Sequence, residues 1–250
     1  MKRQISQTLA ALGLLGSGLG PAAAQETSVP DLNQRIEAYQ EKQQQGESAL
    51  TPADRRTMQQ SMAQIRENLP DPGLEVGSQA PAFTLPNAYG DPVSLGDYLD
   101  KGPVILTFYR GAWCPYCNLE LRALKESLPT FREQGAHILA VTPQKPGHSL
   151  EQVKEDGYPF EILSDLDNQV MRDYRLFFRV PDELVTVYRQ KLGLDLADYN
   201  GSGRYVLPVP ATFVIDQQGI VRAAFARIDY KKRMQPADIL EALRGLNDNP

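Results

Sequence analysis

Cysteine, histidine and tryptophan are scarce in this 250-residue chain, which contains two, two and one of them. A zinc site needs about four ligands, and beyond Cys114 and Cys117 the chain offers only His137 and His148. A disulfide between the two cysteines would close a very short loop and would therefore stabilise the fold little. The scarcity of ligands disfavours a zinc site, and the short loop disfavours a purely structural disulfide. We predict no metal.

Other features are also missing. The sequence has no phosphate-binding glycine loop, no dinucleotide fingerprint and no H-E-x-x-H helix, so we predict no bound cofactor. Net positive charge is absent, because the formal charge is -5; this argues against nucleic acid and anionic membranes as partners. The apolar stretch at residues 9–19 is too short and too rich in glycine for a membrane-spanning helix, and no other run is apolar enough to cross a bilayer, so we predict no stable membrane insertion.

Both cysteines of the chain lie in one stretch, residues 108–117. The apolar run Val104 to Phe108 predicts a buried strand. Cys114 follows it where a helix should begin, and Pro115 suits the first helical position. Free amide groups and the helix dipole would favour a thiolate at Cys114. Cys117, one turn later, is placed to attack a mixed disulfide or sulfenic acid formed there. We interpret this pair as a redox site.

Residues 1–24 have the pattern of a secretory signal peptide. Lys2 and Arg3 supply the basic start, residues 9–19 the apolar stretch and Ala22-Ala23-Ala24 the cleavage site. We therefore predict a protein exported to a bacterial periplasm.

Residues 25–74 predict a helical N-terminal extension, which we call the appendage. Helical patterns cover 31–45 and the stretch from Thr51 to Leu69, whose start resembles a capping box. We interpret the appendage as an amphipathic helical pair packed on the main domain. The alternative is an arm for forming a homodimer or for docking a partner.

Residues 75–250 predict one α/β domain, in which strands alternate with helices and form a mixed or parallel sheet covered on both faces. A short helix is expected to be capped by Ser149 with Gln152. Residues 177–207 interrupt the alternation, and we interpret them as an insertion near the site end of the sheet.

The order of these patterns resembles a known family. Residues 113–117, W-C-P-Y-C, and 209–216, V-P-A-T-F-V-I-D, resemble the thioredoxin fold, and the phrase at 77–83, G-S-Q-A-P-A-F, resembles the alkyl hydroperoxide reductase/thiol-specific antioxidant group of peroxiredoxin-like redoxins. The resemblance implies an α/β thioredoxin-like fold, a central mixed sheet flanked by helices, here with the appendage added.

The resemblance also implies roles for residues. Cys114 would be the attacking cysteine and Cys117 the resolving one, while Pro210 would match the cis-proline that faces the thiols in thioredoxins. The family pattern P-x-x-x-T-x-x-C has Thr107 and Gly111 at its first two fixed places here, and Pro210 occupies the place of its peroxide-orienting arginine. Arg110 could replace that arginine; its alternative is a surface residue at the strand end.

Two functions are predicted: the family resemblance favours the first, and the local chemistry of the cysteine motif favours the second. One is a thiol peroxidase that reduces hydroperoxides and is recycled by a thioredoxin-type electron donor. The other is a periplasmic thiol–disulfide oxidoreductase that acts on protein disulfides. A binding or chaperone module and a copper-handling module stay open as alternatives from other classes.

Several further residues have two interpretations. Trp113 and Tyr109 are expected to wall the thiol pocket or to belong to the core. Glu120 could relay protons if buried, although a helix-surface position is its default. Residues 231–233, K-K-R, predict a solvated loop.

Overall fold

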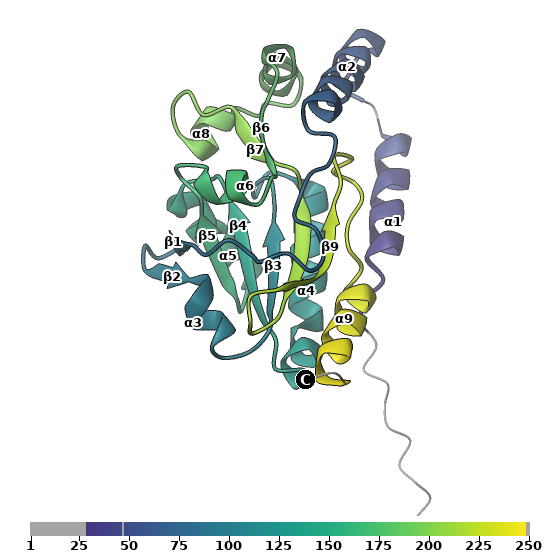
Figure 1. Cartoon of the computed structure of the whole chain (residues 1–250). Helices are drawn as coiled ribbons and strands as arrows, with labels where there is room; N and C mark the ends of the chain where they lie inside the picture. The colour runs from purple at the N-terminus through teal and green to yellow at the C-terminus, as the bar shows by residue number, and fades with distance from the viewer. Residues whose placement is uncertain (1–28, 47, 249–250) are drawn as a thin grey trace, which may run out of the picture.

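The computed structural model describes residues 29–46 and 48–248 of the chain (Figure 1). The predicted signal peptide, residues 1–24, lies outside them. Within the described part, no helix combines the length and apolarity that crossing a bilayer requires.

A five-stranded mixed sheet forms the centre of the molecule, in the order β5-β4-β3-β8-β9. Its strands are β3 (Val104–Phe108), β4 (His137–Thr142), β5 (Glu161–Ser164), β8 (Ala211–Ile215) and β9 (Val221–Ala226). β3 is parallel to β4 and antiparallel to β8, and all five of its residues are buried. The predicted α/β fold with a central mixed sheet flanked by helices is confirmed.

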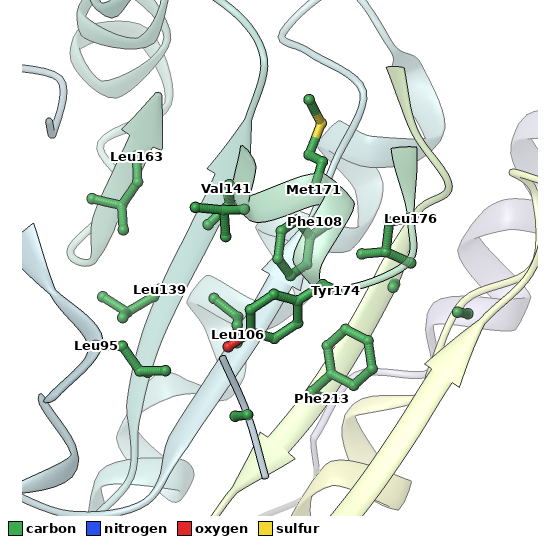
Figure 2. Packing of buried hydrophobic residues seen from close by; sticks show 14 of the residues in the cluster. Leu95, Leu106, Phe108, Leu139, Val141, Leu163, Met171, Tyr174, Leu176 and Phe213 are labelled. Atoms are coloured by element: carbon green, nitrogen blue, oxygen red, sulfur yellow. The ribbon is translucent and has the colours of Figure 1, made fainter. Parts of the chain in front are cut away.

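Side chains that alternate along β3 enter two different cores. Leu106 and Phe108 face α3 (Leu95–Leu99) and α6 (Gln169–Asp173), where Tyr174 and Phe213 join the packing shown in Figure 2. Ile105 enters the opposite core, formed with α4 (Pro115–Glu133) and α9 (Pro236–Asp248). Burial on both faces explains why the strand is continuously apolar.

Two helices precede the sheet, as the appendage predicts: α1 (Leu32–Gln45) and α2 (Pro52–Asn68). Thr51 and Asp54 form the expected capping box of α2. On α1, Leu32 and Ile36 are buried in the cluster that contains both cysteines. The guanidinium of Arg35 also binds the carboxylate of Glu126 on α4 through two hydrogen bonds of 2.8 and 2.6 Å. The appendage therefore packs directly against the thiol-bearing helix.

The stretch predicted as an insertion contains β6 (Phe177–Arg179), α7 (Asp182–Lys191), α8 (Leu196–Asn200) and β7 (Val206–Pro208). β6 and β7 form a separate antiparallel pair. Figure 1 shows α7 beside α2, beyond one end of the central sheet. The appendage and these helices thus meet although more than 100 residues separate them.

The remaining elements are the hairpin of β1 (Thr84–Pro86) and β2 (Pro92–Ser94), and helix α5 (Pro146–Asp156). The predicted cap of α5 is wrong. The helix begins at Pro146, with Lys145 as N-cap, and Ser149 and Gln152 lie buried inside it. Proline at the first position is itself a helix start signal. The hydroxyl of Ser149 instead accepts a hydrogen bond of 3.0 Å from Nε2 of Gln144, and Gln152 bonds residues near the thiol pair, as described below.

Candidate active site

Cys114 lies at the junction of strand and helix that the sequence predicts. It is the N-cap residue of α4, Pro115 occupies the first turn, and the backbone N–H of Cys114 donates to the carbonyl of Gly111 at 3.0 Å. Both cysteines are free thiols and both are buried. The two unlinked thiols therefore lie at the start of α4, where the positive end of the helix dipole is next to Cys114.

The pKa of the Cys114 thiol is lowered to about 6. Burial opposes ionisation, but a hydrogen bond from Cys117 and the positive charges of Arg110 and Arg233 outweigh it. The pKa of Cys117 moves the other way: burial raises it, and so does its partnership with Cys114. At neutral pH the pair therefore consists of a thiolate at Cys114 and a thiol at Cys117.

Arg233 is the residue that sequence reasoning missed. Its Nη2 lies 3.5 Å from Sγ of Cys117, and its Nη1 donates to Oε2 of Glu120 at 2.8 Å. The predicted solvated loop is therefore wrong for this residue, since Arg233 is 4% exposed whereas Lys231 and Lys232 are exposed. A buried carboxylate supplies the reason, because a buried charge needs a partner. No local pattern in K-K-R predicts that its third residue, Arg233, is buried while the two lysines are exposed.

Glu120 is also buried, so the expected helix-surface position is wrong and the condition set for a proton relay is met. Burial raises its pKa to about 7, although Arg233 lowers it in part. Oε1 of Glu120 accepts a hydrogen bond of 3.1 Å from the hydroxyl of Thr212, which itself lies 3.0 Å from the hydroxyl of Thr107. A buried polar chain thus runs from β3 through Glu120 to Arg233.

Arg110 is 5% exposed, so its alternative as a surface arginine is wrong. Nη2 donates to the hydroxyl of Tyr188 at 2.7 Å, and the guanidinium lies 4.8 Å from the Trp113 ring centre and 4.3 Å from that of Tyr230. Aromatic faces attract cations and bring no neutralising charge. The positive charge of Arg110 therefore remains available to the Cys114 sulfur.

Gly111 occupies the family's hydroxyl position because Trp113 leaves no room for a side chain there. Its φ is +144°, and an added Cβ would lie 2.5 Å from Nε1 of Trp113. This departure from the family pattern is therefore coupled to the packing of the indole ring.

A buried hydrogen-bond network holds the loop before Cys114. The N–H of Ala112 donates to Oε1 of Gln144 at 2.9 Å, and its carbonyl accepts from Nδ2 of Asn118 at 2.8 Å. The side chain of Gln152 links Tyr109 to Asn118. Its Oε1 accepts a hydrogen bond of 2.8 Å from the Tyr109 hydroxyl, and its Nε2 donates one of 3.1 Å to Oδ1 of Asn118. Tyr109 is therefore a core residue that fixes this loop.

Above the thiol lies a cavity of about 1080 Å³, which we call the thiol cavity. Cys114 lies at its wall and is only 1% exposed. The appendage contributes Tyr39 and Met58 to the lining, α7 contributes Tyr188, and Trp113 lines it as predicted. Access to Cys114 is thus controlled by elements from three distant parts of the sequence.

Pro210 does not line the thiol cavity but a separate, small one, together with Arg110 and Tyr188. Every peptide bond within residues 29–46 and 48–248 is trans, so the expected cis-proline is wrong. Trans is the intrinsically favoured isomer of an X-Pro bond. The preceding residue, Val209, is also held by a hydrogen bond of 2.8 Å to the Leu176 carbonyl.

Neither histidine joins the cysteines. His137 begins β4 beside Val104, at the end of β3 away from the thiols, and its ring contacts Tyr98. His148 bonds Glu151 and the carbonyl of Asp198. In the described part of the chain, no three His, Cys, Asp or Glu side chains cluster as metal ligands would.

Comparison with known proteins shows that more than half of this chain matches one protein family. Residues 76–224 match the AhpC/TSA family. A thiol–disulfide oxidoreductase ResA from Geobacillus kaustophilus is 33% identical over 150 residues, which cover 60% of this chain and 68% of that protein. A chloroplastic peroxiredoxin Q from Sedum lineare is 27% identical over 174 residues, covering 70% and 78%.

Among solved structures, the peroxidoxin BcpB of Mycobacterium tuberculosis matches with a TM-score of 0.54 at 21% identity. The match covers 69% of this chain and 98% of that one, and it shows a shared fold. Helices α1 and α2 precede the residues matched to the family.

Proposed function

This chain belongs to the AhpC/TSA family, and on that premise we propose that it is a thiol peroxidase that reduces hydroperoxides at Cys114. The observation that carries the proposal is the pairing of a low pKa at Cys114, about 6, with almost complete burial below a cavity. A small hydroperoxide can enter such a cavity, whereas the disulfide of a folded protein needs an exposed sulfur.

In the first step, the thiolate of Cys114 attacks the terminal oxygen of the hydroperoxide. The S–O bond forms as the O–O bond breaks, Cys114 becomes a sulfenic acid, and the alkoxide leaves as an alcohol after taking up a proton. Arg110 supports this step electrostatically. Its charge stabilises the thiolate and the developing negative charge on the leaving oxygen, a task that the family assigns to another arginine.

In the second step, the Cys117 sulfur attacks the sulfenic sulfur, the S–S bond forms as the S–O bond of the sulfenic acid breaks, and the hydroxyl oxygen leaves as water after taking up the proton that Cys117 has given to the general base. Cys117 must lose its proton, and Glu120 is the acid–base group joined to it through Arg233. With a pKa of about 7, Glu120 is partly ionised at neutral pH and can accept that proton. A thioredoxin-type dithiol then supplies two electrons and two protons and restores both thiols.

The second candidate is a thiol–disulfide oxidoreductase that acts on protein disulfides. It is favoured by the C-P-Y-C pair and by the similarity to the protein named ResA. In this function the appendage would have to move away from Cys114 before a folded substrate could dock.

A paired assay separates the two functions. One arm measures consumption of hydrogen peroxide and an organic hydroperoxide with a thioredoxin donor, and the other measures insulin disulfide reduction. The parent protein, Cys114→Ser and Cys117→Ser are carried through both arms. Cys114-dependent peroxide consumption with slow insulin reduction supports the peroxidase. Fast insulin reduction with background peroxide consumption supports the second candidate instead.

We further propose export to a bacterial periplasm, supported by the signal-like pattern of residues 1–24. Fractionation of a bacterial host expressing the full chain, with mass spectrometry of the mature N-terminus, tests this. A protein that remains in the cytoplasm with Met1 or Lys2 at its start would contradict it.

A further inference from the structure

The thiol cavity is much larger than hydrogen peroxide requires. Its volume of about 1080 Å³ is comparable to the ~300–1000 Å³ of sites that enclose small organic ligands. Six aromatic rings line it: Tyr39, Trp113, Tyr116, Tyr188, Tyr199 and Tyr230. Hydrogen peroxide has no apolar surface to bury against these rings. A hydrocarbon body, in contrast, is stabilised in proportion to the apolar area that it buries.

Apart from the Cys114 thiolate, the charged side chains among the described lining residues are all positive. Arg55, Arg110 and Lys231 line the cavity, and none of the described lining residues is acidic, although the chain as a whole carries a formal charge of -5. Arg110 is already engaged by Tyr188 and the aromatic rings. Arg55 and Lys231 form no ion pair within the described residues, and Nη1 of Arg55 donates only to the hydroxyl of Ser48.

Together these features describe an amphipathic, anionic ligand. From the aromatic lining and from two cations of the thiol cavity that form no ion pair with a described residue, we propose that this protein binds organic acids with an apolar body there, and that its substrates are hydroperoxides that carry a carboxylate. Arg55 and Lys231 hold the carboxylate, while the rings of Tyr39 and Tyr116, 5.3 Å apart, contact the hydrocarbon. The hydroperoxide group is then directed to Cys114.

The assignment makes the appendage part of the substrate site. Arg55 belongs to α2 and Tyr39 to α1, and both precede the residues matched to the family. Specificity for an acid would therefore be a property added to the family's redox domain by this chain's own extension. The inference rests on the proposed peroxidase function for its substrate, but the binding site can be tested without catalysis.

Binding is tested with decanoate and methyl decanoate, which share a hydrocarbon chain and differ in charge. Calorimetry measures affinity, and the emission of Trp113 shows where the ligand binds, because it is the only tryptophan of the chain and lines the cavity. We expect saturable binding of decanoate that perturbs Trp113, with an affinity at least about tenfold higher than that of the ester, as a charge-assisted hydrogen bond provides.

Matched variants locate the carboxylate. Arg55→Gln and Lys231→Gln should each weaken decanoate binding severalfold, and the double variant should remove the preference over the ester. Arg56→Gln and Lys232→Gln, which make the same charge change beside the cavity residues, should retain it. Equal affinity for acid and ester, or an acid preference that survives the double variant, overturns the assignment.

Turnover gives the second readout. With a fatty-acid hydroperoxide and its methyl ester, kcat/KM should favour the acid, and Arg55→Gln should lower the acid-to-ester ratio while Arg56→Gln does not. If decanoate binds as expected but no hydroperoxide is consumed, the proposed peroxidase function fails and the binding site stands. If Cys114-dependent consumption is found with equal rates for acid and ester in every variant, the peroxidase function stands and the substrate inference fails.

Discussion

The guanidinium of Arg233 contacts the sulfur of Cys117, with Nη2 3.5 Å from Sγ, although 116 residues separate them in the chain. The same group neutralises Glu120. One buried cation therefore interacts with both a thiol and a carboxylate. Removing it should lower the stability of the fold and change the ionisation of the thiol pair.

Replacing Arg233 by Gln should lower the free energy of unfolding by about 3–5 kcal/mol, because it leaves the Glu120 carboxylate buried without its partner. It should also raise the pKa of Cys114, which the charge of Arg233 holds down. Urea unfolding and thiolate absorbance against pH measure the two effects. Arg233→Lys should recover part of the pKa shift, and Lys232→Gln should change neither quantity. A Cys114 pKa that stays near 6 in folded Arg233→Gln would contradict the assigned role.

The alkylation rate of Cys114 should rise with pH and reach half its maximum near pH 6, since only the thiolate reacts and the pKa is about 6. In Arg110→Gln the midpoint should move upward by ~1 unit or more, because a nearby opposite charge is lost. Iodoacetamide labelling resolved by peptide mass spectrometry measures both profiles. Arg122→Gln, which removes an exposed arginine on α4, the helix that begins at Cys114, is the matched control. An unchanged midpoint in Arg110→Gln would show that the aromatic-bound charge does not act on the sulfur.

Disulfide formation after a hydroperoxide pulse should accelerate with rising pH through about 7. Below that pH Glu120 is protonated and cannot accept the proton of Cys117; above it the carboxylate can. Glu120→Gln should slow this step by about 100-fold and remove the inflection, whereas Glu133→Gln, an exposed change on the same helix, should preserve it. Stopped-flow emission of Trp113 follows the step. Persistence of the inflection in Glu120→Gln would assign it to another group.

Introducing the family's hydroxyl at position 111 should harm this protein. Gly111→Thr forces a branched side chain into a backbone with φ of +144° and toward Nε1 of Trp113. The strain should destabilise the fold by roughly 1–3 kcal/mol and lower the rate of Cys114 oxidation. Thermal unfolding and peroxide kinetics test it against Gly147→Ala, where an added Cβ meets open space. A Gly111→Thr variant that is both stable and faster would mean that the indole ring moves aside readily.

Detaching α1 should expose Cys114 to large reagents. Ile36→Asp places a charge in the cluster that contains both cysteines, which is unfavourable enough to displace the helix. Labelling of Cys114 by a bulky maleimide should become at least tenfold faster, equivalent to about 1.4 kcal/mol of lost docking energy. Labelling by iodoacetamide should change less. Ala38→Asp introduces the same charge on the exposed face of α1 and serves as control. If both variants accelerate maleimide labelling equally, the docking of α1 does not control access to Cys114.

Local sequence was sufficient for the strand, the helix start and the fold class. The apolar run of β3, the proline after Cys114 and the capping box of α2 each depend on neighbours within a few residues. Backbone propensities and capping act over that range, so they can be interpreted without coordinates. The thiol pair at the N-terminus of α4 was therefore predictable in its place and in its charge preference.

Only the tertiary structure decided which charges act on that pair. Arg110, Glu120 and Arg233 are polar residues that usually lie at the surface, and no local pattern distinguishes them from their exposed neighbours. Glu120 and Arg233 are buried because α4 packs against the sheet beside Thr212 of β8, and the folded chain brings Arg233 to the same carboxylate. Arg110 is buried where Tyr188 and the rings of Trp113 and Tyr230 meet it. Likewise, the packing of α1 and of the α2–α7 pair, rather than any motif, encloses Cys114 in a cavity. Coulomb interactions depend on distance in space and on burial, and a single sequence specifies neither for residues 100 positions apart.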